Sequence, residues 1–158
     1  MNDPAVGKAV DGVVSGVVGM VVVDHGARRP EANEQHEHFV RAWPPDGRYV
    51  AVEPAHMELA EPSIGSAFDA CVAAGATMVV VAPYFLWPGT HWDRDIPALA
   101  GQAAARHPGV HYLVTAPLGP HPLLREIIEQ RVDHCLAHVS GAAPECEVCA
   151  GSGRCHLQ

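Results

Sequence analysis

Lysine is almost missing from this sequence: Lys8 is the only one among ten basic residues, which stand against 18 acidic ones. The formal net charge of the 158-residue chain is therefore −8 at pH 7. Proteins that hold nucleic acids through the phosphates need a strongly basic face. The composition thus predicts no nucleic-acid partner.

Long hydrophobic runs are also missing. The stretch GVVSGVVGMVVVD is too short to cross a bilayer and ends at the charged Asp24. It has neither the basic start nor the small-residue cleavage site of a secretory signal. We expect a buried strand here and no membrane partner. Without a secretion signal, the five cysteines are expected to be thiols or metal ligands rather than disulfides.

Common catalytic and nucleotide-binding motifs are absent as well. The chain has no GxGxxG or Walker-type loop, and no serine or cysteine stands in a nucleophile elbow. Histidine, in contrast, is in excess, with eleven residues spread along the chain. Because imidazole binds metals and titrates near physiological pH, this excess favours metal handling or proton transfer.

The hydrophobic pattern predicts one α/β domain. Four times an apolar run precedes a helical pattern, which is typical of a parallel sheet with helices on both faces. The expected strands are Val17–Asp24, Tyr49–Glu53, Thr77–Ala82 and Val110–Thr115, and the expected helices are Pro30–Trp43, Pro62–Ala74, Asp93–Arg106 and Pro122–Ala137. From Ser140 the composition shifts to small residues, Gly, Pro and Cys. We therefore expect a domain over residues 1–139 and a cysteine-rich tail over residues 140–158.

The loop after the first expected strand reads DHGARRPEAN. His25 stands where the chain leaves the sheet, and Gly26 allows a sharp turn. Arg28 and Arg29 follow before the next helix, whose N-terminal N–H groups favour anions. The alternative is a histidine that caps the strand, followed by two solvated arginines. This loop alone does not separate the two interpretations.

The loop after the second expected strand packs Glu53, His56, Glu58 and Glu61 into nine residues. Carboxylates beside an imidazole can bind a metal or move protons. The alternative is a solvated acidic loop that caps the next helix. We prefer this alternative for Glu53 and Glu61, because each stands directly before a proline.

The third such loop, APYFLWPGTHWDRD, carries His91 among aromatic residues and a proline. This pattern suits a flat, hydrophobic ligand beside a metal or proton site. The alternative is that the aromatic side chains only cover the end of the sheet. Those side chains are Tyr84, Phe85, Trp87 and Trp92.

The three loops can meet in one cleft, because ligand sites of parallel sheets lie at the carboxyl ends of the strands. The residues alone therefore predict a pocket with His25, Glu58 and His91, lined by aromatic and arginine side chains. Such a pocket fits a metal-handling or proton-transferring enzyme whose substrate is anionic and has an apolar face.

Four motifs also resemble a known family: HGARRPEAN, AHMELAEPSI, PYFLWPGTHW and TAPLGPHPLL. They are similar to those of the short class II chelatases, and most of all to the sirohydrochlorin ferrochelatases of plant and algal plastids. The resemblance runs from about Val21 to the C-terminus. It implies a chelatase fold, a homodimer, and insertion of ferrous iron into sirohydrochlorin, the last step of siroheme synthesis. It also implies the chloroplast stroma, with a bacterial cytoplasm as the alternative.

The resemblance places the catalytic residues at His25, Glu58 and His91, the two histidines holding the substrate iron. Arg28 and Arg29 are expected to bind the carboxylates of the substrate.

Arg94 is a third candidate for this carboxylate contact. Its alternative is an ordinary pairing with Asp93 or Asp95 on the surface of the helix.

The tail contains most of the cysteines. Cys71 lies in a helical pattern and is expected to be a small buried residue. By spacing, the remaining four fit a zinc site, an iron–sulfur cluster or a redox disulfide, and the spacing leaves these open. The resemblance implies that Cys135, Cys146, Cys149 and Cys155 bind a [2Fe–2S] cofactor with a regulatory or stabilising role.

Two other functions compete with ferrous iron insertion. A cobaltochelatase of cobalamin synthesis would use the same fold, since imidazole and carboxylate accept either ion. A metal carrier or redox sensor without catalysis would bind metal but no tetrapyrrole.

Overall fold

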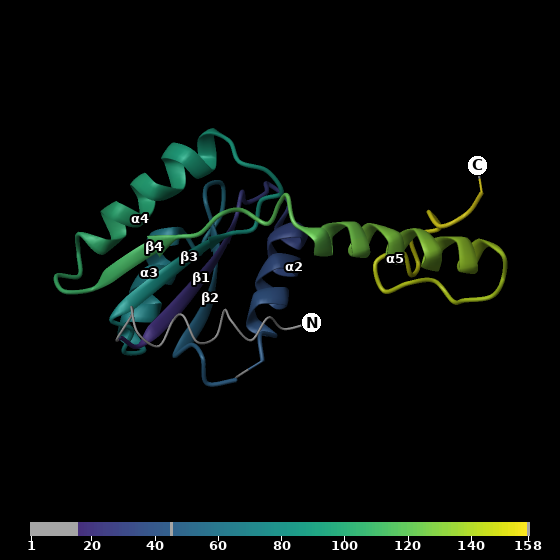
Figure 1. Cartoon of the computed structure of the whole chain (residues 1–158). Helices are drawn as coiled ribbons and strands as arrows, with labels where there is room; N and C mark the ends of the chain where they lie inside the picture. Colours follow the sequence, from purple (N-terminus) through teal and green to yellow (C-terminus); the bar gives the residue numbers. More distant parts are fainter. Residues whose placement is uncertain (1–15, 45, 158) are drawn as a thin grey trace. The chain divides into compact units, whose positions relative to one another are not determined.

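The computed structural model describes residues 16–44 and 46–157. They belong to two compact units, one ending at Leu118 and the other beginning at Gly119. The first unit contains the sheet and the three strand-end loops, and the second contains the last helix and the cysteine-rich segment (Figure 1). The boundary expected between residues 139 and 140 stays a prediction.

The first unit is built on a four-stranded parallel sheet in the order β2-β1-β3-β4. The parallel α/β sheet expected from the sequence is thereby confirmed. Its strands are β1 (Val18–Asp24), β2 (Ala51–His56), β3 (Met78–Pro83) and β4 (His111–Val114). The inner residues of β1 are all buried, as expected for a central strand with both faces covered.

Helices cover both faces of this sheet (Figure 1). They are α2 (Pro30–Arg41) on one face, and α3 (Ile64–Ala73) and α4 (Ile96–Ala104) on the other. A five-residue π-helical turn, η1 (His91–Asp95), leads into α4. Helices on both faces were expected and are confirmed.

The apolar core follows the alternation of side chains along β1. Met20 and Val22 point to one face and pack with Val40 of α2. Val21 and Val23 point to the other face, into a larger cluster that contains Phe68 of α3 and Ile96 of α4. Each fully buried side chain of this size stabilises the fold by about 1.5–3 kcal/mol.

The chain leaves β1 toward α2 on one face and leaves β3 toward α4 on the opposite face. The gap between β1 and β3 is therefore the point where the direction of winding reverses. Ligand sites of open α/β sheets lie at this point, beyond the carboxyl ends of the strands.

The second strand differs from the prediction. It was expected over Tyr49–Glu53, with the proline as its end, but it runs over Ala51–His56 and includes Pro54. Pro54 is tolerated because β2 is an edge strand, where a missing N–H need not break a ladder. His56 thus belongs to the strand rather than to the loop, and it is fully buried.

Other element ends shift by a few residues. The third helix was expected from Asp93, but the helical segment already begins at His91 with the π-helical turn. Cys71 is fully buried in the core, as expected, and burial raises the pKa of its thiol to about 12.

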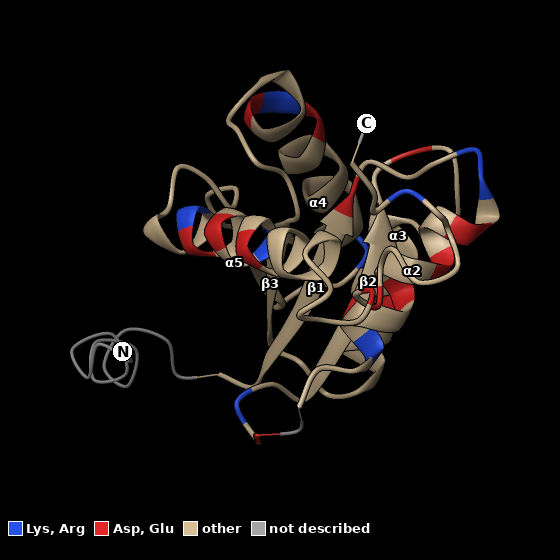
Figure 2. Ribbon diagram, turned by 90° about the vertical axis from the view of Figure 1, so that its right-hand side faces the viewer, with Lys and Arg blue, Asp and Glu red and all other residues tan. Residues whose placement is uncertain are grey.

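The second unit contains α5 (Pro122–Val139), two residues longer than expected, and the segment after it. In the described part of that segment, up to Leu157, the chain forms turns and bends. None of the helices in the described residues is both long and apolar enough to cross a membrane. Figure 2 shows acidic and basic residues sharing individual helices.

Candidate active site

The first two strand-end loops meet at His25 and Glu58. His25 directly follows β1, and its Nε2 lies 2.9 Å from Glu58 Oε1. The backbones also join, because Glu58 N–H donates to His25 O at 3.2 Å. Side-chain exposures of 43% for His25 and 52% for Glu58 leave the pair open to a ligand.

Gly26 makes this approach possible. Its φ of +84° is a conformation that favours glycine, and a Cβ at this position would lie 2.0 Å from Glu58 O. The sharp turn expected after His25 is confirmed. The close contact between the two loops therefore depends on a residue without a side chain.

The third loop brings His91 beside the first histidine. The ring centroids of His25 and His91 are 5.3 Å apart, with an edge-to-face angle of 69°. His91 Nδ1 donates to Asp95 Oδ2 at 2.8 Å, which leaves Nε2 as the lone-pair nitrogen of the neutral ring. Two imidazoles and a carboxylate thus share one solvent-open space. That set can bind a divalent metal and accept protons.

Asp95 also binds the guanidinium of Arg94, whose Nε donates to Asp95 Oδ1 at 2.8 Å. The hydrogen bond from Arg94, followed by that from His91, holds the pKa of the Asp95 carboxyl below its ordinary value. The pairing of Arg94 with Asp95, which the sequence offered as an alternative, is present in the structure.

Arg28 and Arg29 are exposed and line an open hollow next to the His25 loop. The hollow has a volume of about 600 Å³, and Pro30, Glu31, Ala32 and Gln35 complete its lining. Two guanidinium groups at the N-terminus of α2 create positive potential beside the histidines, in a chain that is otherwise acidic.

The aromatic side chains of the third loop divide into two groups. Phe85 packs against the core, and Trp92 Nε1 donates to Thr115 O at 2.8 Å, so both hold the loop in place. Tyr84 and Trp87 are 45% and 64% exposed and can face a ligand. The covering role therefore applies to Phe85 and Trp92, whereas contact of Tyr84 and Trp87 with a flat ligand stays a prediction.

Glu61 has the capping role preferred for it. Its Oε2 accepts from Ser63 N at 2.7 Å and from Ser66 Oγ at 2.9 Å at the start of α3. These hydrogen bonds, the one from Ser63 N first, lower the pKa of the Glu61 carboxyl.

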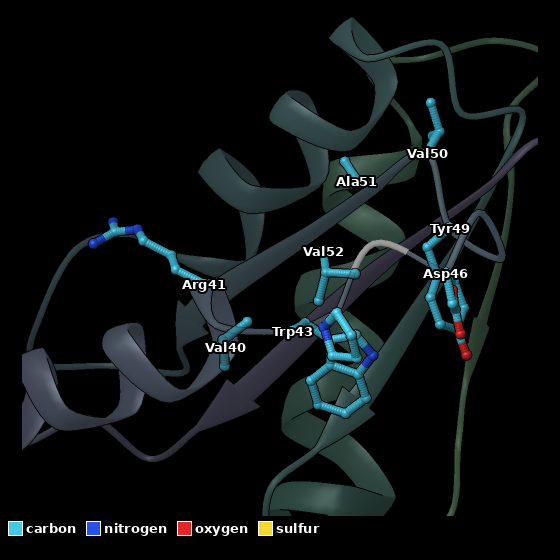
Figure 3. A pocket seen from close by; sticks show the side chains of 9 residues that line it. Val40, Arg41, Trp43, Asp46, Tyr49, Val50, Ala51 and Val52 are labelled. Atoms are coloured by element: carbon cyan, nitrogen blue, oxygen red, sulfur yellow. The ribbon is translucent and has the colours of Figure 1, made fainter.

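A second cavity, of about 180 Å³, lies away from the histidines (Figure 3). Trp43, Tyr49 and Val50 are among its lining residues, close to the start of β2. Since parallel strands start at the edge of the sheet opposite to their carboxyl ends, this cavity is separate from the site of His25 and Glu58.

The second unit holds four cysteines that influence one another electrostatically. The pKa of the Cys149 thiol is raised, first by Cys146, and the pKa of the Cys155 thiol is raised to about 11, first by burial and then by Cys135. Backbone N–H groups of Cys149 and Val148 lower the pKa of the Cys146 thiol. All of the described cysteines are free thiols.

Across residues 16–44 and 46–157, no three His, Cys, Asp or Glu side chains already have the spacing of a complete metal site. Metal binding at the histidines or the thiols would therefore require side chains to move.

Comparison with known proteins decides the family. Residues 19–135, most of the chain and all of the sheet unit's strand-end loops, match the family CbiX. The chain belongs to the CbiX family.

Curated relatives carry chelatase names. The chain is 55% identical over 139 residues to "Sirohydrochlorin ferrochelatase, chloroplastic" of Arabidopsis thaliana, which covers 88% of this chain and 62% of that protein. It is 33% identical over 114 residues to a "Sirohydrochlorin cobaltochelatase" of Priestia megaterium, with 72% of this chain and 37% of that protein covered. The chain thus spans less than two thirds of the length of these relatives.

Solved structures of the same family share the fold. The chelatase SirB of Bacillus subtilis subspecies spizizenii, in complex with cobalt, matches with a TM-score of 0.69 at 28% identity, over 74% of this chain and 50% of that one. The CbiX protein of Marinobacter aquaeolei VT8 matches with a TM-score of 0.64 at 28% identity, over 77% of this chain and 98% of that one. The class II chelatase fold expected from the sequence is confirmed.

Two residues that shape this CbiX site were missed in the sequence. Asn33 is buried in α2 and exchanges hydrogen bonds with both backbone groups of Ala27, at 2.8 and 2.9 Å. Asp95 orients His91. The four-residue spacing from His91 to Asp95, which matches one helical turn, was a usable signal for Asp95.

Proposed function

We propose that this chain inserts ferrous iron into sirohydrochlorin to form siroheme. The observation that carries the proposal is the meeting of His25, Glu58 and His91 at the reversal point of a CbiX-family sheet. The 55% identity to a protein named sirohydrochlorin ferrochelatase supports the choice of metal and substrate.

The reaction replaces two pyrrole N–H protons by one ferrous ion, so the site must deliver the metal and take up two protons. In the proposal, His25 and His91 hold the incoming iron as neutral ligands, which bind it without adding negative charge. Of the two pyrrole protons, Glu58, 2.9 Å from His25, accepts one, and an imidazole accepts the other once it has released the iron to the macrocycle.

Arg28 and Arg29 bind the substrate in this proposal. Sirohydrochlorin is a polycarboxylate, and the chain carries a net charge of −8, so local positive charge has to offset repulsion. The two guanidinium groups line the hollow next to His25 and can each bind a carboxylate in bidentate fashion. Arg94 is a weaker candidate, because its Nε is already bonded to Asp95.

The proposal is tested by mixing the purified protein with ferrous iron and sirohydrochlorin under anaerobic conditions. The absorption change to siroheme should appear at a rate proportional to protein concentration. Iron binding without any change in the tetrapyrrole spectrum would contradict catalysis and favour a metal carrier.

Cobalt insertion is a second candidate function. It is favoured by the cobaltochelatase relative and by the cobalt-bound structure of SirB. Comparing kcat/KM for ferrous iron and Co²⁺ under the same conditions separates the two. A preference for Co²⁺ would reassign the chain to the cobalt pathway.

We also propose that Cys135, Cys146, Cys149 and Cys155 bind a [2Fe–2S] cluster as a resident cofactor. The type of donor fits: four cysteines lie in the second unit, three pairs of them interact, and backbone N–H groups favour the thiolate of Cys146. Since the histidine site lies on the strand-end loops of the first unit, the proposed role of the cluster is regulatory or stabilising.

Cluster binding is tested by anaerobic reconstitution. The wild type and Cys71→Ala should develop visible cluster absorption, whereas Cys146→Ser or Cys155→Ser should not. Stoichiometric zinc binding by the same thiols, without visible absorption, would contradict the assignment.

Assembly and location complete the proposal: a homodimer in the chloroplast stroma. The location is supported by the Arabidopsis relative, which is named chloroplastic. Light scattering of the purified protein gives the mass of the assembly, and chloroplast fractionation gives the compartment.

A further inference from the structure

Asp24 and His56 form a hydrogen-bonded pair directly beneath His25 and Glu58. They are the last residues of β1 and β2 and lie opposite each other in the register of the two strands. His56 Nδ1 lies 2.6 Å from Asp24 Oδ1. We propose that Asp24 and His56 are positioning residues, which fix the spacing between His25 and Glu58. This inference rests on the proposed chelatase function.

Asp24 holds the first loop. Its Oδ1 accepts a second hydrogen bond, from Gly26 N at 2.9 Å, in addition to that from His56. Its backbone O accepts from Met57 N at 2.8 Å, immediately before Glu58. One residue therefore joins the turn that carries His25 to the segment that carries Glu58.

His56 is fixed on all sides. It is fully buried, and because a carboxylate only accepts, Nδ1 must be the nitrogen that donates to Asp24. Its Nε2 faces Glu37 of α2 at 3.7 Å, which is beyond hydrogen-bond distance. The ring is anchored by its bond to Asp24 and lies 5.5 Å from the ring of His36 of α2, between centroids.

Burying the imidazole of His56 at this position destabilises the fold relative to burying an apolar side chain. His56 Nε2 has no hydrogen-bond partner among the described residues, and leaving a buried polar atom unpaired costs about 1–3 kcal/mol. A phenylalanine would fill the space without this cost. What the imidazole supplies is the hydrogen bond to Asp24, and through Asp24 the geometry of the His25 turn.

A neighbouring imidazole supports the same carboxylate. His36 of α2 is buried, its Nε2 donates to Val22 O at 3.1 Å, and its Nδ1 faces Asp24 Oδ2 at 3.8 Å. The Asp24 carboxylate thus lies next to two histidines, and its Oδ1 accepts the hydrogen bonds from His56 and Gly26.

Two substitutions at His56 separate positioning from packing. Asparagine places its amide nitrogen where Nδ1 lies and can keep the bond to Asp24, whereas glutamine places it where Nε2 lies and cannot. Since misplacing a catalytic group by a fraction of an ångström lowers rates strongly, we expect His56→Gln to reduce kcat by about 10–100-fold. His56→Asn should stay within about 3-fold of the wild type, and KM for sirohydrochlorin should change little in both.

Two substitutions at Asp24 test the positioning role independently, in case a His56 variant folds poorly. Asp24 has a side chain that is 23% exposed, so its replacement disturbs the core less. Asp24→Asn retains an oxygen for His56 and Gly26 and should keep more of kcat than Asp24→Ala. His38→Gln, at an exposed histidine of the neighbouring helix α2, serves as the control and should behave as the wild type.

The outcomes distinguish this inference from the proposed function. A wild-type protein without metal insertion would contradict the proposed function itself. If the wild type is active but His56→Asn and His56→Gln have equal kcat, or differ only in KM, the positioning role alone is overturned. In a Glu58→Gln background, the loss from His56→Gln should shrink, because His56 acts through the spacing of that pair.

Discussion

His91 and Asp95 are joined by a 2.8 Å hydrogen bond across one turn of η1, from Nδ1 to Oδ2. The bond fixes the orientation of the His91 ring and leaves its Nε2 free of Asp95, with the ring 5.3 Å from that of His25 between centroids. Arg94 holds the other oxygen of Asp95 at 2.8 Å, so the carboxylate is fixed from two sides. The histidine that we propose as an iron ligand is therefore oriented before any ligand arrives.

Removing this support should slow metal insertion. We predict that Asp95→Ala lowers kcat by about 10–100-fold, the usual effect of losing the carboxylate that orients a ligand histidine. Asp93→Ala removes an exposed carboxylate two residues away and should stay within about 2-fold. Steady-state siroheme formation measures both, and equal rates for the two variants would refute an orienting role of Asp95.

Gly26→Ala should inactivate the protein for a local steric reason. The new Cβ would lie 2.0 Å from Glu58 O, so the two loops would have to separate. Gly75→Ala is the matched control: Gly75 also has a positive φ, +101°, but no atom lies within 4 Å of the added Cβ.

Both glycine variants should lose about 1 kcal/mol of stability from backbone strain alone. Chemical unfolding measures that loss, and siroheme formation measures the activity. If Gly75→Ala were as inactive as Gly26→Ala, the contact between the loops would not be the reason.

Arg28 and Arg29 should act on substrate binding. We predict that the double change Arg28→Gln and Arg29→Gln raises KM for sirohydrochlorin by about 10-fold or more with little change in kcat, because bonds to carboxylates are lost in ground and transition state alike. Arg48→Gln removes an equal charge per residue at the other end of the sheet, before β2. A similar rise of KM in Arg48→Gln would show a general charge effect instead of a binding site.

The stability of the sheet unit should decrease in acid, in part through Asp69. His107 Nε2 lies 2.6 Å from Asp69 Oδ1, and Arg106 donates a hydrogen bond to the same oxygen at 2.8 Å. The bond from His107, followed by that from Arg106, lowers the pKa of the Asp69 carboxyl. A lowered pKa means that the carboxylate stabilises the fold above its ordinary pKa, about 4, and that this contribution disappears as the pH falls through the lowered value.

The Asp69 side chain is 48% exposed, so we expect an effect of about 1 kcal/mol or less. Urea unfolding of the wild type and of Asp69→Asn between pH 3 and pH 6 should converge at the acidic end. Glu34→Gln, an exposed carboxylate of α2, should show no such convergence. A constant difference between wild type and Asp69→Asn at all pH values would contradict the assignment.

The proximity of the three candidate residues could be predicted from the sequence, because loops that follow parallel strands lie at the same edge of the sheet. His25, Glu58 and His91 follow three different strands, and parallel strands end at one edge. That reasoning needs no distances, and the structure brings the three side chains together. The alternation of apolar residues predicted the strands in the same way, apart from β2.

The details that escaped prediction depend on tertiary contacts. Pro54 indicated a strand end, because the sequence does not show that β2 is an edge strand. His56 was expected in the loop after the second strand, with its role left open, but register with Asp24 buries it. The pairing of Asp95 with His91 was missed because the helix was expected to begin at Asp93, whereas the helical segment already begins at His91.

His25 and His91 are the residues that we propose to carry out metal insertion, and the rate of siroheme formation by their alanine variants tests this role. Siroheme formation from ferrous iron and sirohydrochlorin is measured by absorbance under anaerobic conditions. The proteins compared are the wild type, His25→Ala, His91→Ala and, at an exposed histidine, His111→Ala. Circular dichroism checks that each variant is folded. We predict an active wild type, an unchanged His111→Ala, and folded His25→Ala and His91→Ala variants that lose about 10²-fold or more in rate. Wild-type rates in both of these variants would contradict the account.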